Sequence, residues 1–439
     1  MTLEMPDYVP PRGMKDIDTG EMEKRLWINE KIEPVFDTHN FRRVEPSFIE
    51  HLETLTAKSG SSVMNEIYHF KDKSGRDLAL RFDLTVGIAR MVANDFATPE
   101  PIKLYAISPM WRYDEPQAGR FRCFWQWDIE EFGPSEVYAD AEVIGTSVKA
   151  MQALGLSDVS VRMSSRKLME ELIASISPTL KSDTVSILRI LDKSAKVGEE
   201  ELKSMLRAGG MDAETVERLL EATKLSGNID AVRDGLNRFR SEKLNAAMKE
   251  LVTVWEELES IGVRHACTVD LGIVRGLDYY DGIVFEGFEA EAGNLSLFGG
   301  GRYNGLTRIY GKRDLPATGA AGGIERLLMV LEKRGTFKTG GKTARVFVAI
   351  TTDAVRRNGL AVCQRLRSRG IVAEYPVKRW SLRRQLEYAN TAGFTHVLVV
   401  GEREVQRSVY TLKELKSGTQ YELDLEGVLS SLAPVAQHG

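Results

Sequence analysis

Arginines set among aromatic and acidic residues mark the stretch of the chain best suited to chemistry on a phosphorylated substrate. Trp111-Arg112-Tyr113-Asp114 ends one predicted strand, and Gly119-Arg120 leads into the next, which we predict over 121–132. Alternate side chains of a strand share a face, so one row could contain Arg120, Arg122, Phe124, Gln126, Asp128 and Glu130, the last four unless a bulge intervenes. Such a row could hold a phosphate, a purine and an amine, because the guanidinium fork matches phosphate oxygens. A salt-bridged antiparallel sheet is the alternative.

Two further segments could bring a cation to the same place. Arg275 precedes Gly276, and Tyr279 and Tyr280 follow, so a cation and phenolic hydroxyls could share one pocket. A turn leading into a core strand is the alternative there. Arg326 lies at the beginning of an apolar helix, on the side that we expect to be buried. A buried arginine needs a partner, which is either an anionic ligand or an internal acid such as Glu325.

Standard nucleotide-binding and metal-binding fingerprints are missing. Gly341-Lys342-Thr343 lacks the earlier glycine of a Walker A motif, so we interpret it as part of a linker. The run Gly299-Gly300-Gly301-Arg302-Tyr303-Asn304-Gly305 lacks GxGxxG spacing and indicates only a turn or a close backbone approach. There is no HExxH, and the 6 histidines and 3 cysteines do not cluster, so we predict no metal site.

Composition favours a soluble, cytoplasmic protein. The 439 residues are 43% hydrophobic and 28% charged. No apolar run approaches the roughly 20 residues that span a bilayer, the chain does not begin like a secretory signal, and three separated cysteines suit a reducing compartment. The net charge of −4 is uneven, since residues 344–439 contain 14 Lys and Arg against 9 Asp and Glu. This basic excess could meet a polyanion, although ordinary variation of surface charge would also explain it.

Periodicity and turn chemistry predict the elements that position these residues. We expect a helix at 22–37, extended chain at 41–50, a hairpin of 66–70 with 78–82, and strands at 102–108 and 121–132. Helical spacing dominates 166–260, with a break at Gly209-Gly210; strands return over 268–305, and 320–333 is predicted helical. After a linker at 336–342, strands at 346–350, 371–375 and 396–400 alternate with helices at 353–369 and 381–391, which predicts a parallel α/β domain.

Taken in order, these segments resemble the motifs of class II aminoacyl-tRNA synthetases. Residues 22–46 resemble motif 1 of that class, residues 111–131 resemble motif 2, and residues 320–328 resemble motif 3. The segments Arg275 to Tyr280 and Gly299 to Tyr303 are similar to segments peculiar to histidyl-tRNA synthetases. The resemblance runs from about Pro11 to Leu425. It implies an α+β catalytic core with an antiparallel sheet flanked by helices at 1–165 and 261–335, a mostly helical insertion at 166–260, and a C-terminal α/β anticodon-binding domain at 344–439.

The resemblance also implies an activity and partners. Members of that family join histidine to ATP as histidyl-adenylate, release pyrophosphate, and transfer histidine to the 3′ end of histidine tRNA. Mg²⁺ accompanies the ATP phosphates, and members dimerise through motif 1. Position by position, the resemblance implies that Arg112 and Arg275 bind the α-phosphate of ATP and Arg120 the γ-phosphate. It also implies that Arg326 binds the ATP tail and that Phe124 stacks on the adenine. For the histidine substrate, it implies that the α-ammonium group is bound by Asp83, Thr85 and Gln126. It further implies that the imidazole is bound by Glu130 and Tyr280, and that Tyr279 and Arg275 also contact the histidine.

Two positions depart from the pattern of bacterial members of the family. Asp83 is one methylene shorter than the glutamate of bacterial members, and together with Asp128 it resembles the archaeal and eukaryotic branch. Glu115 stands where many bacterial members have an arginine, so the reading of the extra 5′ guanosine of histidine tRNA stays open, although Gln117 is retained for the acceptor end.

Two other functions compete with the ligase. One is the regulatory subunit of ATP phosphoribosyltransferase, a paralogue that lacks the anticodon domain and usually parts of the catalytic set. The other is an RNA-binding or kinase-regulatory protein with a degenerate core. The presence of Arg112, Arg275, Arg326 and the terminal domain favours the ligase over both.

Overall fold

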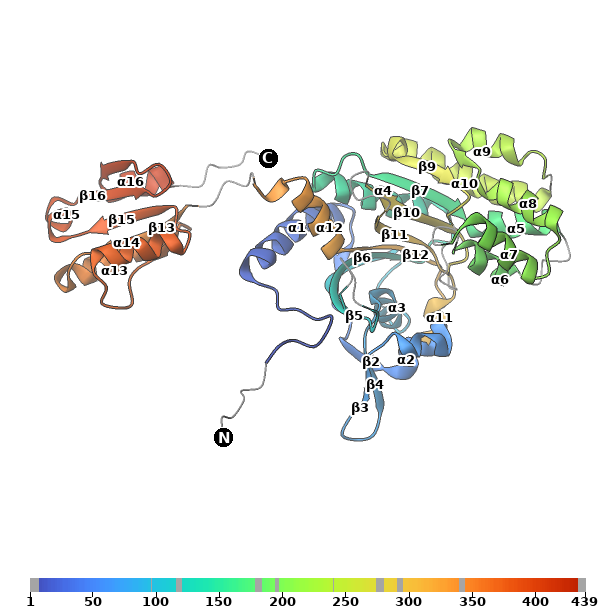
Figure 1. Ribbon diagram of the computed structural model, residues 1–439, viewed down its shortest axis with the longest axis horizontal. Helices are drawn as coiled ribbons and strands as arrows, with labels where there is room; N and C mark the ends of the chain where they lie inside the picture. The colour runs from blue at the N-terminus through green and yellow to red at the C-terminus, as the bar shows by residue number, and fades with distance from the viewer. Residues whose placement is uncertain are drawn as a thin grey trace. The chain divides into compact units, whose positions relative to one another are not determined.

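The computed structural model describes residues 8–95, 97–115, 121–177, 184–193, 197–239, 241–273, 280–289, 295–338 and 344–432. The chain divides into two compact units, Met1–Gly335 and Thr336–Gly439 (Figure 1). In the part of the chain that the structure describes, no helix combines the length and the apolar character needed to cross a membrane.

A large mixed sheet forms the base of the first unit. Among the described residues its strands pair in the order β1-β5-β6-β12-β11-β10-β7-β9-β8. The central strands from β5 to β7 are antiparallel, which confirms the predicted core, whereas β1 pairs with β5 and β9 with β7 in parallel. The strands are β1 (Arg42–Arg43), β5 (Ile102–Trp111), β6 (Cys123–Phe132), β7 (Ser160–Ser165), β8 (Ser226–Gly227), β9 (Cys267–Asp270), β10 (Ile283–Phe288), β11 (Ser296–Arg302) and β12 (Ala317–Gly323).

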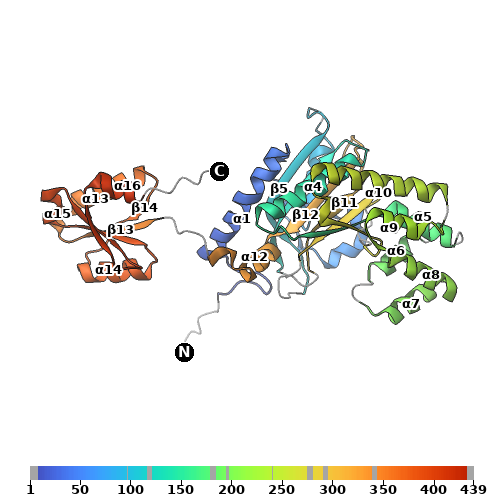
Figure 2. The ribbon, with the colours of Figure 1, turned by 90° about the horizontal axis from the view of Figure 1, so that it is seen from above.

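Helices flank both faces of this sheet, as predicted. On one face α1 (Thr19–Thr38), α4 (Tyr138–Ala153) and α10 (Glu242–Ile261) lie side by side (Figure 2), and α12 (Ile324–Lys333) packs beside α1. Phe36 of α1 and Trp127 of β6 are fully buried with ring centroids 5.7 Å apart, so aromatic packing fixes this layer. On the other face, α3 (Leu84–Val92) and α11 (Leu306–Tyr310) pack against apolar residues of β5 and β6.

The predicted start of the last helix of this unit is wrong. The sequence predicts helix from Ala320, whereas Ala320 to Gly323 complete strand β12 and the helix begins at Ile324. Strand β12 lies between β6 and β11, and a Cβ at Gly322 would be only 2.5 Å from Trp127 Nε1. Small residues here serve close packing between strands, and that packing overrides the helical pattern.

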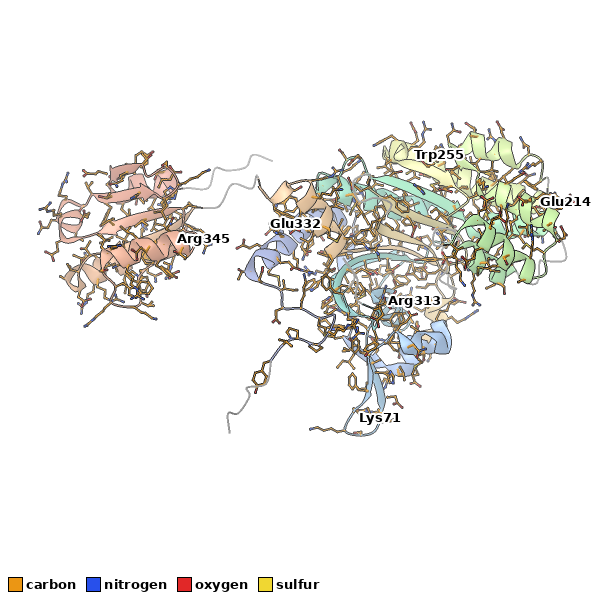
Figure 3. The ribbon with its side chains drawn as sticks, viewed as in Figure 1. Lys71, Glu214, Trp255, Arg313, Glu332 and Arg345 are labelled. Carbon is orange, nitrogen blue, oxygen red and sulfur yellow. The ribbon has the colours of Figure 1, made fainter. Side chains whose placement is uncertain are left out.

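A smaller sheet forms beside the large one. Its strands β2 (Ile49–His51), β4 (Asp77–Leu80) and β3 (His69–Lys71) pair antiparallel in that order, and the β3–β4 hairpin, with Lys71 near its end, extends outward (Figure 3). Gly75 in its turn has φ 80°, a conformation that favours glycine. Helix α2 (Leu52–Ser59) and the 3₁₀ turn η1 (Gly60–Asn65) contribute Leu55 and Val63 to the apolar core under Ala79.

Helices fill most of the stretch 166–260, which confirms the helical insertion. They are α5 (Arg166–Ile176), α6 (Thr184–Leu191), α7 (Glu199–Ala208), α8 (Ala213–Thr223), α9 (Ile229–Leu236) and α10. Side chains of Ser165, Asp212, Asn228 and Ser241 each accept a backbone N–H at a helix start, which explains where these helices begin. The break between α7 and α8 contains Gly210, with φ 92°, as its glycine pair predicts.

The second unit contains the predicted parallel α/β arrangement. Strands β13 (Arg345–Ile350), β14 (Val372–Glu374) and β15 (His396–Val400) are parallel in the order β14-β13-β15. The sheet continues with antiparallel β16 (Tyr410–Glu414) and β17 (Gln420–Leu423), which the sequence patterns did not predict. Helices are α13 (Arg356–Ser368), α14 (Leu382–Thr391), α15 (Glu402–Arg407) and α16 (Leu425–Leu432), and apolar clusters lie on both sheet faces.

Candidate active site

Four side chains of β6 form a row on one face of the large sheet. The pairing of β6 with β5 is continuous from Cys123 to Phe132, so no bulge interrupts the alternation. Phe124, Gln126, Asp128 and Glu130 therefore share the face that α3 approaches, while Trp127 points to α1. An aromatic ring, an amide and two carboxyl groups thus follow one another along a single strand.

Arg122 does not join this row, which the sequence pattern had left open. Strand β6 begins at Cys123, and Arg122 Cζ lies 4.0 Å from the ring centroid of Tyr113. Its Nε donates to the Asp114 carbonyl at 3.0 Å and its Nη1 to the Arg12 carbonyl at 3.3 Å. The Arg122 guanidinium is therefore bound to backbone carbonyl groups outside β6 and does not face the row of Phe124, Gln126, Asp128 and Glu130.

Small residues of β12 lie beside the row. Gly319, Ala321 and Gly323 pair with Glu130, Asp128 and Gln126, respectively. A Cβ at Gly319 would lie 1.7 Å from Glu130 Oε2, so only glycine admits the carboxyl in this position. A Cβ at Gly323 would meet nothing closer than the Arg326 side chain at 3.9 Å. The sheet face is thus filled by the Glu130 carboxyl group beside Gly319 and is more open beside Gly323, which pairs with Gln126.

The start of α3 brings two more polar side chains to the row. Asp83 is the N-cap residue, with extended φ −150°, and its Oδ1 accepts from the Val86 N–H at 3.3 Å. Thr85 is buried, and its Oγ1 lies 3.4 Å from Asp128 Oδ2. Gln126 Nε2 lies 3.4 Å from the same oxygen. Thr85 and Gln126 therefore contact Asp128, and the charge of Asp83 acts on it; the resemblance assigns these three residues to an α-ammonium group.

Arg112 and Phe124 lie together at the other end of the row. Arg112 Cζ is 5.2 Å from the ring centroid of Phe124, and its Nε donates to the Phe82 carbonyl at 3.0 Å. Because Phe82 precedes Asp83, this arginine also contacts the segment that carries the ammonium acceptors. A half-buried guanidinium against an aromatic ring offers both a cation for phosphate and a surface for stacking.

The Asp128 and Glu130 carboxyl groups are buried, 0% and 1% exposed, and are successive members of the row on one face of β6. Burial raises the pKa of Asp128 well above its ordinary value, and the charges of Glu130 and Asp83 raise it further. Burial also raises the pKa of Glu130 to about 7, against the opposing effect of hydrogen bonds from Thr85, Tyr303 and Asp128.

Two tyrosines complete the Glu130 end of the site. The hydroxyl of Tyr303, which is buried, donates to Glu130 Oε2. Tyr280 is buried beside Gly301, where a Cβ would lie 3.0 Å from its Cδ1, and Gly301 pairs with Gly319. Sequence reasoning gave Tyr303 no role. Its position within the glycine-rich run 299–305 was the available signal.

Glu325 and Arg326 at the start of α12 have different partners. Glu325 is buried, accepts from the Trp125 N–H at 3.0 Å, and forms a 2.8 Å ion pair with Arg25 of α1. Arg326 Nη1 donates to the Ser296 carbonyl. Glu325 therefore takes Arg25 as its internal partner, whereas the sequence had suggested Arg326 for that role.

The structure thus brings most of the expected site residues together. Four of them, Arg120, Gln117, Arg275 and Tyr279, lie outside the described residues, and their roles stay predictions. Those that gather on or beside the β6 row are Asp83, Thr85, Arg112, Phe124, Gln126, Glu130, Tyr280 and Arg326.

Known proteins match the chain over almost its whole length. A family model described as histidyl-tRNA synthetase matches residues 13–327, and one described as anticodon binding domain matches residues 345–433. A histidine–tRNA ligase of Pyrococcus horikoshii is 37% identical over 424 residues, 96% of this chain and 97% of that protein. That of Thermococcus kodakarensis is 36% identical, with coverages of 96% and 97%.

Solved structures share the fold. The crystal structure of histidyl-tRNA synthetase from Nostoc sp. matches with a TM-score of 0.84 at 26% identity, covering 98% of this chain and 99% of that one. A structure from Bacillus halodurans, described as an ATP phosphoribosyltransferase regulatory subunit/histidyl-tRNA synthetase, has a TM-score of 0.77 at 22% identity and covers 90% of this chain. Its likeness extends to the fold alone.

An antiparallel sheet with this row of side chains, in one chain with an anticodon-binding domain, defines a class II aminoacyl-tRNA synthetase. The extent of the family match and the identity to the archaeal relatives then decide the subgroup. The chain belongs to the histidyl-tRNA synthetase family.

Proposed function

We propose that the chain is a histidine–tRNA ligase. It joins L-histidine to ATP, with histidyl-adenylate and pyrophosphate as products, and then transfers the histidyl group to the 3′ end of histidine tRNA. The observation that carries the proposal is the grouping of two carboxyl groups, a guanidinium and an aromatic ring along one strand face. Family membership supports the same reaction.

Arg112 stabilises the charge that develops during adenylation. The histidine carboxylate attacks the α-phosphorus of ATP, pyrophosphate leaves, and negative charge grows on the α-phosphate oxygens. Arg112 is held beforehand by the Phe82 carbonyl and the Phe124 ring, so it needs no rearrangement to meet that charge. By resemblance, Arg275 joins it at the α-phosphate and Arg120 binds the γ-phosphate. Loss of one such donor typically lowers kcat roughly 10²–10³-fold.

Hydrogen bonds select histidine. Asp83, Thr85 and Gln126 accept from its α-ammonium group. A neutral imidazole offers one N–H donor and one nitrogen acceptor, so its site needs both kinds of partner. The Glu130 carboxylate, oriented by Tyr303, accepts the ring N–H, and Tyr280, with Tyr279 and Arg275 nearby, serves the other side of the ring. A site built in this way rejects side chains that lack these groups by large factors.

ATP enters with its own metal ion. Phe124 stacks on the adenine, Arg326 binds the ATP tail, and Mg²⁺ is coordinated by phosphate oxygens, which are ligands of the kind it prefers. Among the residues that the structure describes, no group of three His, Cys, Asp or Glu is arranged to hold a metal ion. We therefore treat Mg²⁺ as part of the nucleotide substrate, and Arg112 with Arg275 as the charge that the protein contributes.

The second unit supplies a surface for tRNA. The segment from Val377 to Arg384, which runs from the loop after β14 into the first turn of α14, contains four cations, one tryptophan and no acid. The Arg379 and Arg383 side chains are 89% exposed, and the Trp380 ring centroid lies 5.6 Å from Arg384 Cζ. Cations of this kind meet phosphates, and unpaired bases stack on aromatic rings. We assign binding of the anticodon loop to this surface.

We further propose that the protein works as a homodimer in the cytoplasm. Phe48, Ile49 and Phe70, in and beside the small sheet, are 46%, 44% and 42% exposed. Apolar surface of this kind is characteristic of contact between proteins, and motif 1 implies dimerisation by resemblance. Sedimentation velocity tests the dimer, and a monomer at working concentrations would contradict it.

Charging of transcribed histidine tRNA tests the function. The assay follows labelled histidine onto tRNA with and without its 5′ guanosine, in wild type and Arg112→Ala, because Glu115 leaves the reading of that nucleotide open. We expect charging with histidine and a roughly 10²–10³-fold loss in the variant. The alternative, a regulatory subunit of ATP phosphoribosyltransferase, predicts neither charging nor histidine-dependent ATP–pyrophosphate exchange.

A further inference from the structure

Asp128 lies at the centre of the proposed histidine site, although neither the resemblance nor the adenylation chemistry gives it a role there. It is fully buried on β6, between Gln126 and Glu130. The neighbouring strands present Ala106 and Ala321 opposite it, so they supply no polar partner. Its Oδ2 has hydrogen-bond donors at 3.4 Å, but its Oδ1 has no donor within the described part of the chain.

Among the residues that the structure describes, the groups around Asp128 provide no cation. Glu130 faces it from β6 and Asp83 from the start of α3, and both are acids. Tyr303 adds a hydroxyl that binds Glu130, and α11 adds Tyr310 close to Asp83. Across the described ranges, neither Asp128 nor Glu130 forms an ion pair. Two buried carboxyl groups therefore lie next to each other on one strand face, and the described residues around them offer no positive charge to offset them.

A shared proton resolves this arrangement. Two carboxylates are both acceptors and repel each other, so adjacent buried carboxyl groups retain one proton between them. Glu130 already accepts a hydrogen bond from the buried Tyr303 hydroxyl, which stabilises its ionised form. Asp128 has an oxygen with no donor opposite it, so the proton belongs there. Burial and the charge of Glu130 also raise the pKa of Asp128 well above its ordinary value.

We propose that Asp128 is a positioning residue that stays protonated at neutral pH and donates a hydrogen bond to the Glu130 carboxylate. The pair then carries one negative charge, and Glu130 is held in a fixed orientation toward the ring N–H of histidine. A singly charged pair suits the neutral imidazole, whereas a doubly charged pair would favour the imidazolium form. The identity of the ligand rests on the proposed function, but the protonation of the pair does not.

Infrared spectroscopy tests the proton directly. The difference between the wild-type and Asp128→Asn spectra at neutral pH should contain the carbonyl stretch of a protonated carboxylic acid. Isotope labelling of aspartate carboxyl groups should shift the same band in the unsubstituted protein, so the test does not depend on folding of the variant. Absence of a buried protonated aspartate band would overturn the proposal, whatever reaction the protein catalyses.

Histidine kinetics test the positioning role. Asp128→Ala removes a hydrogen bond to a charged group, and we expect KM for histidine in ATP–pyrophosphate exchange to rise roughly 10- to 100-fold. Asp128→Asn keeps an N–H donor for Glu130 and should recover most of that loss, and KM for ATP serves as the control in both. Equal losses in the two variants would mean that Asp128 acts as an anion and would overturn the proposal. No histidine-dependent exchange in the wild type would instead refute the proposed function, and the infrared band would still decide the proton.

Discussion

Gly319→Ala places one methyl group against the Glu130 carboxyl, and the structure specifies what it meets. The new Cβ would lie 1.7 Å from Glu130 Oε2, 2.4 Å from its Cδ and 2.8 Å from the Ile129 carbonyl oxygen. The backbone carbonyl belongs to a strand whose pairing with β12 is continuous, so it cannot yield easily. The Glu130 side chain must therefore move, and the hydrogen bond from Tyr303 is lost with that movement.

The expected loss follows from the bond that is broken. A hydrogen bond to a charged group contributes about 1.5–3 kcal/mol. At about 1.4 kcal/mol per factor of ten, kcat/KM for histidine should fall roughly 10- to 150-fold. Overpacking of this kind also destabilises a fold by about 1–3 kcal/mol.

ATP–pyrophosphate exchange, with KM measured separately for histidine and ATP, is the assay for this variant, and thermal unfolding measures its stability. Gly20→Ala is the matched control. Its methyl group, added inside α1, meets only Asp18 Oδ1 at 3.5 Å and should stabilise the helix by about 0.5–1 kcal/mol. A folded Gly319→Ala protein with the wild-type KM for histidine would refute the reasoning that the position of Glu130 determines histidine binding.

Three further outcomes follow from single contacts. Arg25→Ala leaves the buried Glu325 carboxyl without its ion pair and should cost about 3–5 kcal/mol in urea unfolding; an unchanged midpoint would contradict this. Burial raises the pKa of folded Glu130 from 4.5 to about 7, so between these pH values the native state binds a proton that the unfolded state has lost. The free energy of unfolding should therefore fall as pH rises through this range. In unfolding titrations, Glu130→Gln should flatten that fall. Trp380→Ala should remove about 1–3 kcal/mol of stacking and so raise KM for tRNA roughly 5- to 150-fold. A comparable loss of ATP–pyrophosphate exchange activity without tRNA would count against the assigned surface.

The fold was predictable where local patterns decide it. Alternation on β6 correctly predicted that Phe124, Gln126, Asp128 and Glu130 share a face, and the polar residues at helix starts explain the helical stretch. The end of β12 was not predictable, because Ala320 to Gly323 are strand only through packing between β6 and β11. A single sequence contains no local sign of that neighbour.

The contacts that organise the candidate site could not be predicted from the sequence either, because they join residues that are far apart in the chain. Tyr303 and Glu130 are 173 residues apart in the chain, and Arg25 and Glu325 are 300 residues apart, so neither pair has a spacing to recognise. The residue types at Arg112, Asp83 and Glu130 suggested their chemistry, whereas the burial of Asp128, with no cation among its described neighbours, emerges only from the folded sheet.

ATP–pyrophosphate exchange with each standard amino acid in turn tests most directly whether this site activates histidine. We predict exchange with L-histidine alone, and its loss when Arg112 is replaced by alanine. Comparable exchange with an amino acid that lacks the donor and acceptor of the imidazole ring, or no exchange with histidine, would contradict the account.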